Sequence, residues 1–257
     1  MTSAKMGQSA PRLEDRRFLT GTAQYADDLN MEGQVYGAVV RSPHAHADIT
    51  GIDVSAAAAL PGVLGVHTVA DLDADGVGNL PCVAELPEES GFYIPPRPAL
   101  ARDRVRYVGD HVAFVVAQTE SVARAAAELV EVGYEMRPAV TDGMRAQEAG
   151  APLLWDAAAG NVIYRWHKGD KAAMEAAFAA AAHVVELDIV NNKISAAPLE
   201  PRSGIAEYDA ARETYKLTAS AQGLHGIRGQ LAKFVFQVPP ERIEIVAPDV
   251  GGGFGLK

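Results

Sequence analysis

The sequence predicts an α/β (α+β) protein, and two segments carry that prediction. Residues 112–117 are apolar at every position, as in a strand buried on both faces, and a helical pattern follows over 119–129. Nearer the C-terminus, strand patterns at 214–221 and 242–247 are separated by a helical pattern over 223–236. A helical crossover of that length joins parallel strands, because antiparallel strands need only a turn.

Composition and charge exclude several classes of protein. The chain has 257 residues, of which 48% are hydrophobic, and a formal net charge of −10, which argues against a nucleic-acid surface. No run approaches the roughly 18 apolar residues of a membrane helix, and the N-terminus lacks the apolar core of a signal peptide. Together with the single cysteine, Cys82, this predicts a cytoplasmic protein, with peripheral attachment at the inner membrane face left open.

The first 135 residues contain further expected strands and a long loop. A polar arm over 1–17 is expected to lie on another surface, and strands are expected at 34–42 and 62–69. The proline-rich and glycine-rich segment 76–98 is predicted to be a mobile or partner-facing excursion. A half-buried strand is expected over 130–135.

Two helices have a predicted cap and a predicted apolar face. Thr119 caps the first, whose expected apolar face is Val122, Ala125, Ala126 and Leu129. Breakers over 137–165 indicate a domain boundary. A second helix begins at Asp170 and is expected to pack inward through Met174, Phe178 and Ala181, followed by an apolar strand at 183–190.

The last forty residues place two distinctive features at one edge of a sheet. The strand at 214–221 ends just before Gln222, and the strand at 242–247 precedes a glycine-rich loop, Gly251–Gly255. Because parallel strands end at the same edge, Gln222 and the loop are both expected at the carboxyl edge, where α/β proteins bind ligands.

The "GGGFGLK" text by itself leaves two interpretations open. It is either a structural turn or a cradle in which bare backbone N–H groups approach an anionic ligand. The common phosphate and dinucleotide templates both fail at Leu256.

Ordered text along the chain resembles one known family. "FLTGTAQYADDL", "VVRSPHAHADITGIDVSAA", "VRYVGDHVAFVVAQTESVARAAAELVEVGYE", "LEPR", "SAQGLHGIRGQLA" and "VGGGFGLK" resemble the molybdopterin-binding large subunit of xanthine dehydrogenases, aldehyde oxidases and aerobic carbon monoxide dehydrogenases. The resemblance is strongest to the carbon-monoxide-dehydrogenase-like branch. It implies an α/β hammerhead domain over 18–140, a linker over 141–160, and the N-terminal part of a molybdopterin-cofactor domain over 161–257.

The resemblance also implies roles for particular residues. Gln222 would hydrogen-bond an oxygen ligand of molybdenum. The loop residues Gly251, Gly252, Gly253, Phe254 and Gly255 would lie against the metal and the pterin, with Phe254 and Gly255 nearest the metal. Gln222 and Phe254 are thus the candidate catalytic residues, and no residue of this chain is expected to ligate the metal directly.

The implied chemistry is oxidative hydroxylation with water as the oxygen source. The implied cofactor is molybdenum held by molybdopterin, expected in its cytosine dinucleotide form, and copper is left open. Electrons would pass to a [2Fe–2S] small subunit and an FAD-binding medium subunit, in a dimer of heterotrimers. The chain is expected to be the N-terminal portion of a large subunit and inactive alone, because the general base would lie elsewhere. A xanthine, aldehyde or N-heterocycle dehydrogenase, or an inactive docking fragment, is the alternative.

Other polar residues keep two interpretations each. His44, His46 and Asp48 either make structural hydrogen bonds or ligate a metal, and His225 either lines the pocket or simply begins a helix. Glu200 is either a pocket carboxylate or the partner of Arg202 or Arg228 in an ion pair.

Overall fold

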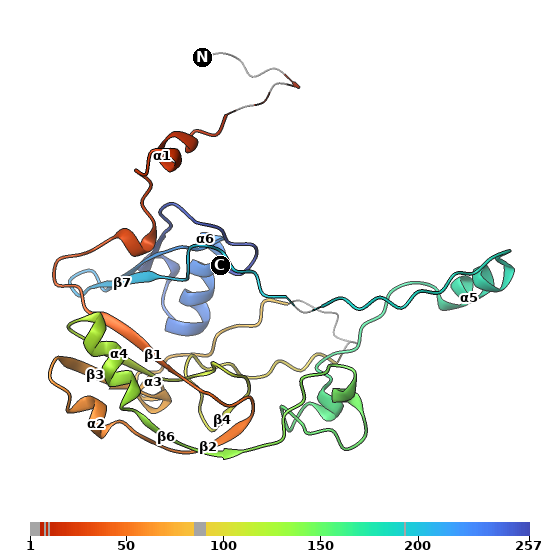
Figure 1. Cartoon of the computed structure of the whole chain (residues 1–257), viewed down its shortest axis with the longest axis horizontal. Coiled ribbons are helices and arrows are strands. Elements are labelled where there is room, and N and C mark those ends of the chain that lie inside the picture. Colours follow the sequence, from red (N-terminus) through yellow and green to blue (C-terminus); the bar gives the residue numbers. More distant parts are fainter. Residues whose placement is uncertain (1–5, 8, 10, 85–90, 193) are drawn as a thin grey trace. The chain divides into compact units, whose positions relative to one another are not determined.

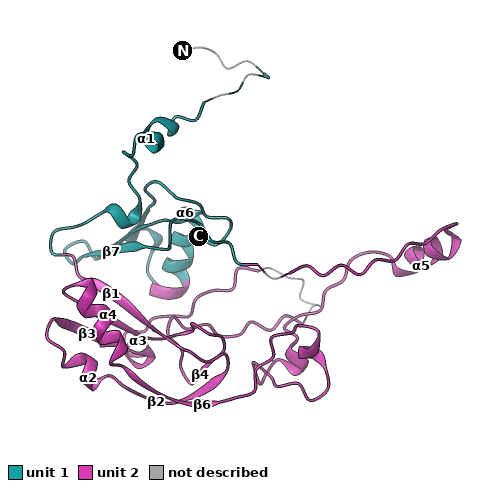
Figure 2. Cartoon of the chain, in the orientation of Figure 1, with its two compact units in different colours: residues 1–33, 195–233, 238–257 teal, residues 34–194, 234–237 magenta. Residues whose placement is uncertain are grey.

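The computed structural model describes residues 6, 7, 9, 11–84, 91–192 and 194–257 (Figure 1). Its contacts divide the chain into two compact units (Figure 2). Unit 1 comprises residues 1–33, 195–233 and 238–257, and unit 2 comprises 34–194 and 234–237. The N-terminal segment therefore packs with the C-terminal part of the chain. The sequence-based domain bounds remain a prediction, since spatial units and sequence domains are different divisions.

Unit 2 contains two antiparallel sheets of three strands. The first has the order β1 (Tyr36–Arg41), β5 (His111–Ala117), β3 (Val63–His67). The second has the order β4 (Arg104–Val105), β2 (Ala47–Asp53), β6 (Glu131–Met136). The run of apolar residues predicted as a buried strand is the central strand β5, whose Val112, Ala113 and Val115 are fully buried.

The core of unit 2 has two clusters that meet along β5. Ala113 and Val115 pack in one cluster with Ala126 and Val130, while Val112 packs in the other with Val105. The strands β5 and β6 follow one another in the sequence and form as predicted, but they belong to different sheets. One strand thus contributes side chains to both cores, although Phe114 of the predicted buried run is 36% exposed.

Helix α4 (Glu120–Glu128) begins where the sequence predicts. The Thr119 hydroxyl accepts a hydrogen bond from the backbone N–H of Val122 at 3.3 Å. The predicted apolar face is only partly right: Ala123 and Ala126 are buried, whereas Leu129 is 40% exposed. Alanines face the sheet because their small side chains let the helix backbone approach β1 and β5 closely.

The remaining helical elements of unit 2 are short, with one exception. They are α2 (Ser55–Ala58), α3 (Val69–Ala74), η3 (Arg145–Gln147) and η4 (Ala159–Asn161). The longer α5 (Lys171–Ala180) begins at Asp170, whose carboxylate accepts from the N–H of Ala173 at 2.9 Å, as predicted. No helix in the described part of the chain combines the length and apolar character needed to cross a lipid bilayer.

The inward face predicted for α5 and the strand predicted after it are wrong for this chain. Met174 and Phe178 are 52% and 57% exposed, because no described element packs against them. Residues 183–190 are exposed and form no strand ladder, with Val185 at 90% exposure. Apolar periodicity reports the tendency to be buried, whereas burial and strand pairing need a partner.

The described parts of the predicted excursion, residues 76–84 and 91–98, contain no helix or strand and are anchored within unit 2, while its mobility or partner contact stays a prediction. The N–H of Gly78 donates to the carbonyl of Val235, and that of Leu80 to Arg97, each at 2.8 Å. The N–H of Tyr93 donates to the carbonyl of Ile163 at 2.8 Å. Residues 85–90 of the predicted excursion lie outside the described residues.

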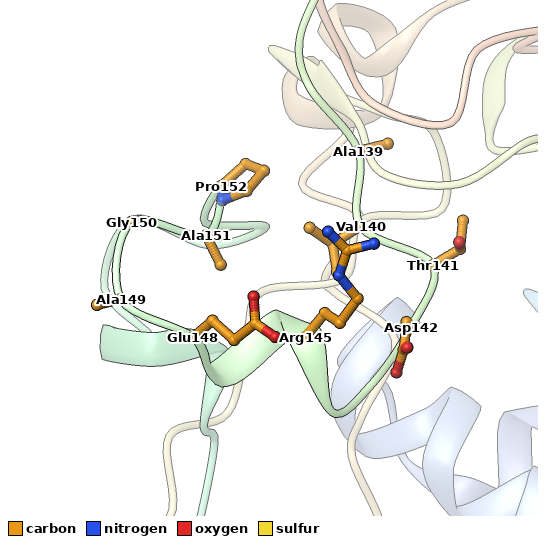
Figure 3. Close-up of a pocket in the computed structure, with 10 residues that line it drawn as sticks. All are labelled: Ala139, Val140, Thr141, Asp142, Arg145, Glu148, Ala149, Gly150, Ala151 and Pro152. Carbon is orange, nitrogen blue, oxygen red and sulfur yellow. The ribbon is translucent and has the colours of Figure 1, made fainter.

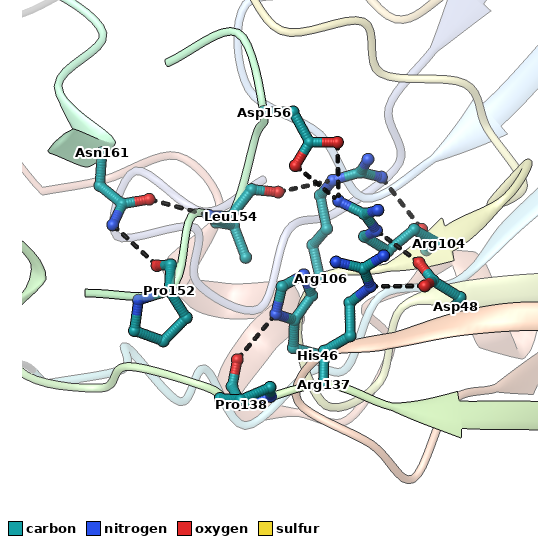
Figure 4. Close-up of polar contacts among 10 residues, drawn as sticks. All are labelled: His46, Asp48, Arg104, Arg106, Arg137, Pro138, Pro152, Leu154, Asp156 and Asn161. Atoms are coloured by element: carbon teal, nitrogen blue, oxygen red, sulfur yellow. Dashed lines mark hydrogen bonds and ion pairs between the residues drawn. The ribbon is translucent and has the colours of Figure 1, made fainter. Parts of the chain in front are cut away.

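A cluster of arginines and aspartates ties β2 to β4 and to the segment after β6 (Figure 4). Asp48 accepts hydrogen bonds from Arg104, at 2.6 Å, and from Arg137. Arg104 also bonds Asp156 at 3.2 Å, and Arg106 bonds the carbonyl of Leu154 at 3.2 Å. The arginine side chains thereby hold the segment 154–156 against the sheet.

The two histidines preceding Asp48 make structural contacts. The Nδ1 atom of His46 lies 2.9 Å from the carbonyl oxygen of Pro138. The His44 ring packs edge-on against the Tyr134 ring at 4.9 Å between centroids. The contacts of His46 and Asp48 support the hydrogen-bonding interpretation of these two side chains, while the His44 side chain makes a ring contact.

Unit 1 has one mixed sheet in the order β7 (Gly204–Asp209), β8 (Thr214–Ala219), β9 (Ile243–Val246). β7 and β8 are antiparallel, whereas β8 and β9 are parallel, with Tyr215 opposite Ile243. The crossover runs through α6 (Leu224–Gln230), the π-helical η5 (Leu231–Phe236) and η6 (Pro240–Arg242). The predicted parallel crossover is confirmed. Near the N-terminus lie α1 (Asp15–Leu19) and η1 (Ala26–Asp28).

Removing the charge of Asp48 is expected to destabilise the protein more than removing an exposed charge. We expect Asp48→Asn to lower the free energy of unfolding by about 1–3 kcal/mol, because Arg104 and Arg137 lose a charged acceptor. The matched control is Glu120→Gln, whose ion pair with Arg124 is exposed, with an expected loss below about 0.5 kcal/mol. Denaturant unfolding of both variants measures the difference, and equal losses would contradict the expectation.

The same contact predicts a pH dependence. The hydrogen bond from Arg104, with that from Arg137, holds the pKa of Asp48 below its usual value. The stabilisation is therefore complete above the ordinary aspartate pKa of about 3.9 and is lost as the pH falls through the lower, folded-state pKa.

Candidate functional site

Parallel pairing brings two distant segments to one edge of the unit 1 sheet. β8 ends at Ala219 and β9 at Val246, and both chains leave the sheet in the same direction. Gln222 follows β8, and the glycine loop Gly251–Gly255 follows β9. The structure joins them directly, because the N–H of Gly255 donates to Oε1 of Gln222 at 3.0 Å. The two features predicted to lie together therefore do so.

The loop has a backbone conformation that ordinary residues avoid. Gly252 and Gly255 have φ angles of 101° and 78°, and Phe254 has a φ of 49°. Phe254 thus pays a strain cost that glycine would not, while its side chain stays 75% exposed. Strained residues of this kind concentrate at functional sites, so Phe254 is a residue to test.

Close approach of neighbouring atoms explains two of the glycines. A Cβ atom on Gly253 would lie 2.3 Å from Oε1 of Gln222. A Cβ on Gly251 would lie 2.5 Å from the Cβ of Glu200. Both distances are far below contact, so a Cβ at either position would force the Gln222 or Glu200 side chain to move.

The loop presents hydrogen-bond donors without protein acceptors. Within the described residues, the backbone N–H groups of Gly252, Gly253 and Phe254 donate to no protein atom. The Gly255 bond occupies the oxygen of the Gln222 side chain and leaves its NH₂ group as a donor. This donor set fits an anionic, oxygen-rich ligand.

Beneath the loop lies a buried carboxylate. Oε2 of Glu200 accepts hydrogen bonds from Oγ of Ser220 at 2.5 Å, the N–H of Gly251 at 2.6 Å and Nζ of Lys257 at 2.8 Å. The Lys257 and Glu200 side chains are 1% and 7% exposed. Burial alone raises the pKa of Glu200, but these three donors outweigh it and lower the pKa below its usual value. The carboxylate is therefore charged at neutral pH.

The interpretation of Glu200 as the partner of Arg202 or Arg228 is wrong. Arg202 donates to the carbonyl of Leu256 at 3.1 Å, and Arg228 donates to the carbonyl of Pro240 at 2.8 Å. Lys257 takes the place of both, because it returns beneath the loop whose first N–H also reaches Glu200. The other oxygen, Oε1, is buried without a partner among the described residues.

Sequence reasoning also missed a contact before the loop. Arg17 bonds both oxygens of Asp249, with Nε at 3.0 and 3.1 Å. The only feature of the sequence that hints at this contact is an aspartate near the glycines. The two residues are 232 positions apart, so no local pattern connects them.

Two hollows of the surface lie away from the loop. One, of about 320 Å³, is lined by residues 139–142, 145 and 148–152 of unit 2, with Arg145 and Glu148 at its wall (Figure 3). Another, of about 450 Å³, lies between α6 and β9 and includes the exposed His225. Neither hollow includes Gln222 or the glycine loop. His225 is the second residue of α6, and it lines the second hollow instead of the candidate site.

Two protein-family models match the chain in succession. Residues 20–138 match the model described as aldehyde oxidase and xanthine dehydrogenase, a/b hammerhead domain. Residues 154–257 match the molybdopterin cofactor-binding domain. The glycine loop and Gln222 fall within the second match.

Characterised relatives align along nearly the whole chain. The carbon monoxide dehydrogenase large chain of Afipia carboxidovorans is 38% identical over 98% of this chain and 31% of its own length. The nicotine 6-hydroxylase large subunit of Paenarthrobacter nicotinovorans is also 38% identical, over 100% of this chain and 31% of its own. The chain thus spans about a third of the length of these relatives.

A solved structure shows the same fold. Quinoline 2-oxidoreductase from Pseudomonas putida 86 superposes with a TM-score of 0.84 and is 38% identical, covering 96% of this chain and 31% of that one. Together with the two successive family matches, this confirms the resemblance read from the motifs: the chain belongs to the xanthine dehydrogenase and aldehyde oxidase family of molybdopterin-dependent oxidoreductases, as part of their large subunit.

Proposed function

We propose that this chain forms part of the catalytic large subunit of a molybdenum hydroxylase, and that Gln222 and the loop Gly251–Gly255 contact the molybdopterin cofactor. One observation carries the proposal. The amide side chain of Gln222 and a loop of bare backbone N–H groups meet at the carboxyl edge of a parallel strand pair.

The residues present fit such a group. The bare backbone at Gly251 and Gly253 lets Glu200 and Gln222 approach closely, and three consecutive N–H groups beyond Gly251 are free of protein acceptors among the described residues. When bound, the cofactor supplies a molybdenum centre that accepts two electrons while water provides the oxygen of the product. The NH₂ group of Gln222 would donate a hydrogen bond to the bound group, and the loop N–H groups would stabilise its negative charge.

The buried ion pair beneath the loop keeps these donors in place. Glycines lose much conformational freedom when they are ordered, so a loop of glycines needs fixed neighbours. The Glu200 carboxylate accepts a hydrogen bond from the N–H of Gly251. Lys257, which follows the loop in sequence, neutralises the charge of that carboxylate. Preorganised donors of this kind cost no reorganisation during a reaction.

The substrate and partners belong to the same proposal. Carbon-monoxide-dehydrogenase-like chemistry is supported by the relative from Afipia carboxidovorans, while the equally similar nicotine 6-hydroxylase favours an N-heterocycle. We propose a cytoplasmic complex with an FAD-binding medium subunit and a [2Fe–2S] small subunit, and the cytosine dinucleotide form of the cofactor.

The role of Gln222 is tested in the complete large subunit, purified with its partner subunits. We expect molybdenum to copurify with the wild type, and Gln222→Ala to retain it while lowering turnover about 10²-fold to 10³-fold, because a preorganised donor is lost. Turnover is measured with carbon monoxide, nicotine and quinoline. Gln230→Ala, in α6, is the matched control and is expected to behave as wild type. A wild-type complex without molybdenum would refute the proposal.

The close approach at Gly253 makes a separate prediction. In Gly253→Ala, the new Cβ would displace the Gln222 side chain, so we expect turnover to fall several-fold while molybdenum is retained, as in Gln222→Ala. Gly229→Ala is the matched control, because a Cβ there meets nothing within 4 Å in the helical backbone of α6. Turnover per bound molybdenum in the two purified variants measures the difference, and equal turnover would contradict the expectation.

The buried ion pair predicts strong coupling. Lys257→Met leaves Glu200 charged and buried, and we expect a loss of about 3–5 kcal/mol in stability. The double variant Glu200→Gln, Lys257→Met should lose less than Lys257→Met alone, because no uncompensated charge remains. Thermal unfolding of these two variants and of Glu200→Gln alone completes the cycle, and simple additivity would show that the pair is not coupled.

A further inference from the structure

The N-terminal segment makes contacts that the proposed function does not use. We propose that residues 17–25, here termed the N-terminal strap, fix the stem of the glycine loop, and that Arg17 is the positioning residue. The inference rests on the proposed function only for its effect on the cofactor, because the contacts of the strap are independent of any ligand.

Arg17 forms an ion pair with Asp249, which lies two positions before the glycine loop. Its guanidinium reaches both carboxylate oxygens of Asp249, through Nε at 3.0 and 3.1 Å and through an additional short contact from its terminal nitrogen. Paired contacts of this kind fix orientation as well as distance, because the guanidinium and the carboxylate are both planar. Asp249 is 10% exposed and Arg17 is 46% exposed.

The backbone of the strap adds two further contacts to the same residue. The N–H of Gln24 donates to Oδ2 of Asp249 at 3.1 Å, and the N–H of Asp249 donates to the carbonyl of Gln24 at 3.0 Å. Both the side chain and the main chain of Asp249 are therefore held. The hydrogen bond from Arg17 also lowers the pKa of Asp249, so its carboxylate is charged at neutral pH.

The strap is itself folded back on α1. The N–H of Thr20 donates to the carbonyl of Arg16 at 3.0 Å, and the N–H of Thr22 to the carbonyl of Arg17 at 2.9 Å. The Arg17 guanidinium also lies 5.2 Å from the centroid of the Phe18 ring. These local bonds fix the turn that directly follows Arg17.

The position of Asp249 makes this contact matter for the loop. Gly251 to Gly253 carry no side chains with which to fix their own place, so the loop depends on its flanking residues. Asp249 is held by the strap before the loop, and Gly251 is held by Glu200 at its beginning. Releasing the first anchor frees the stem while the buried ion pair stays intact. The effect on global stability is expected to be small, because Arg17 is half exposed.

The experiment uses the complete large subunit with its partner subunits and three variants. Arg17→Gln removes the charge and the paired contact, Arg17→Lys keeps the charge but not the planar fork, and Arg16→Gln is the matched control on the same helix. We expect amide hydrogen exchange across residues 250–256 to be about tenfold faster in Arg17→Gln, intermediate in Arg17→Lys and unchanged in Arg16→Gln. Loss of molybdenum during dialysis should follow the same order, with the melting temperature of all variants near that of wild type.

The outcomes separate this inference from the proposed function. Unchanged exchange in Arg17→Gln would overturn the strap, whatever the metal content. A wild-type complex that holds no molybdenum would refute the proposed function, while faster exchange in Arg17→Gln would still support the strap. A large fall in melting temperature for Arg17→Gln would also overturn the inference, because it would assign Arg17 to global stability instead of loop position.

Discussion

The parallel pairing of β8 with β9 is the constraint on which the candidate site depends. Two parallel strands end at the same edge of their sheet, so the residues that follow them meet whatever their separation in sequence. The crossover through α6 makes this pairing possible, since a direct turn would produce an antiparallel pair. Gln222 and the glycine loop are neighbours for this reason, and the N–H of Gly255 donates a hydrogen bond to the Gln222 side chain.

Glycines create the loop, but other residues decide where it lies. The absence of side chains at Gly251 and Gly253 permits the close approach of Glu200 and Gln222. The same absence leaves these residues no side chain with which to anchor themselves. Two charged contacts supply the anchors: the buried Glu200–Lys257 pair beneath the loop and the Arg17–Asp249 pair before it. The exposed backbone N–H groups of the loop therefore depend on these two ion pairs for their position.

Burial in unit 2 shows how strongly an element depends on its neighbours. α4 and α5 have similar alanine-rich sequences, yet α4 buries Ala123 and Ala126 against a sheet, while α5 stays exposed along its length. The apolar residues 183–190 likewise remain exposed. The chain spans about a third of the length of its relatives, and packing found within it is the packing that its own elements supply.

The sequence alone determined the fold class, the crossover, the helix caps at Thr119 and Asp170, and the meeting of Gln222 with the loop. These follow from local chemistry and periodicity, which act over a few residues. Tertiary structure alone decided the partner of Glu200, the contact between Arg17 and Asp249, and which predicted apolar faces are buried. Those outcomes depend on residues far apart in the chain, such as the 57 positions between Glu200 and Lys257. No local pattern encodes them, because an ion pair forms wherever the fold brings opposite charges together.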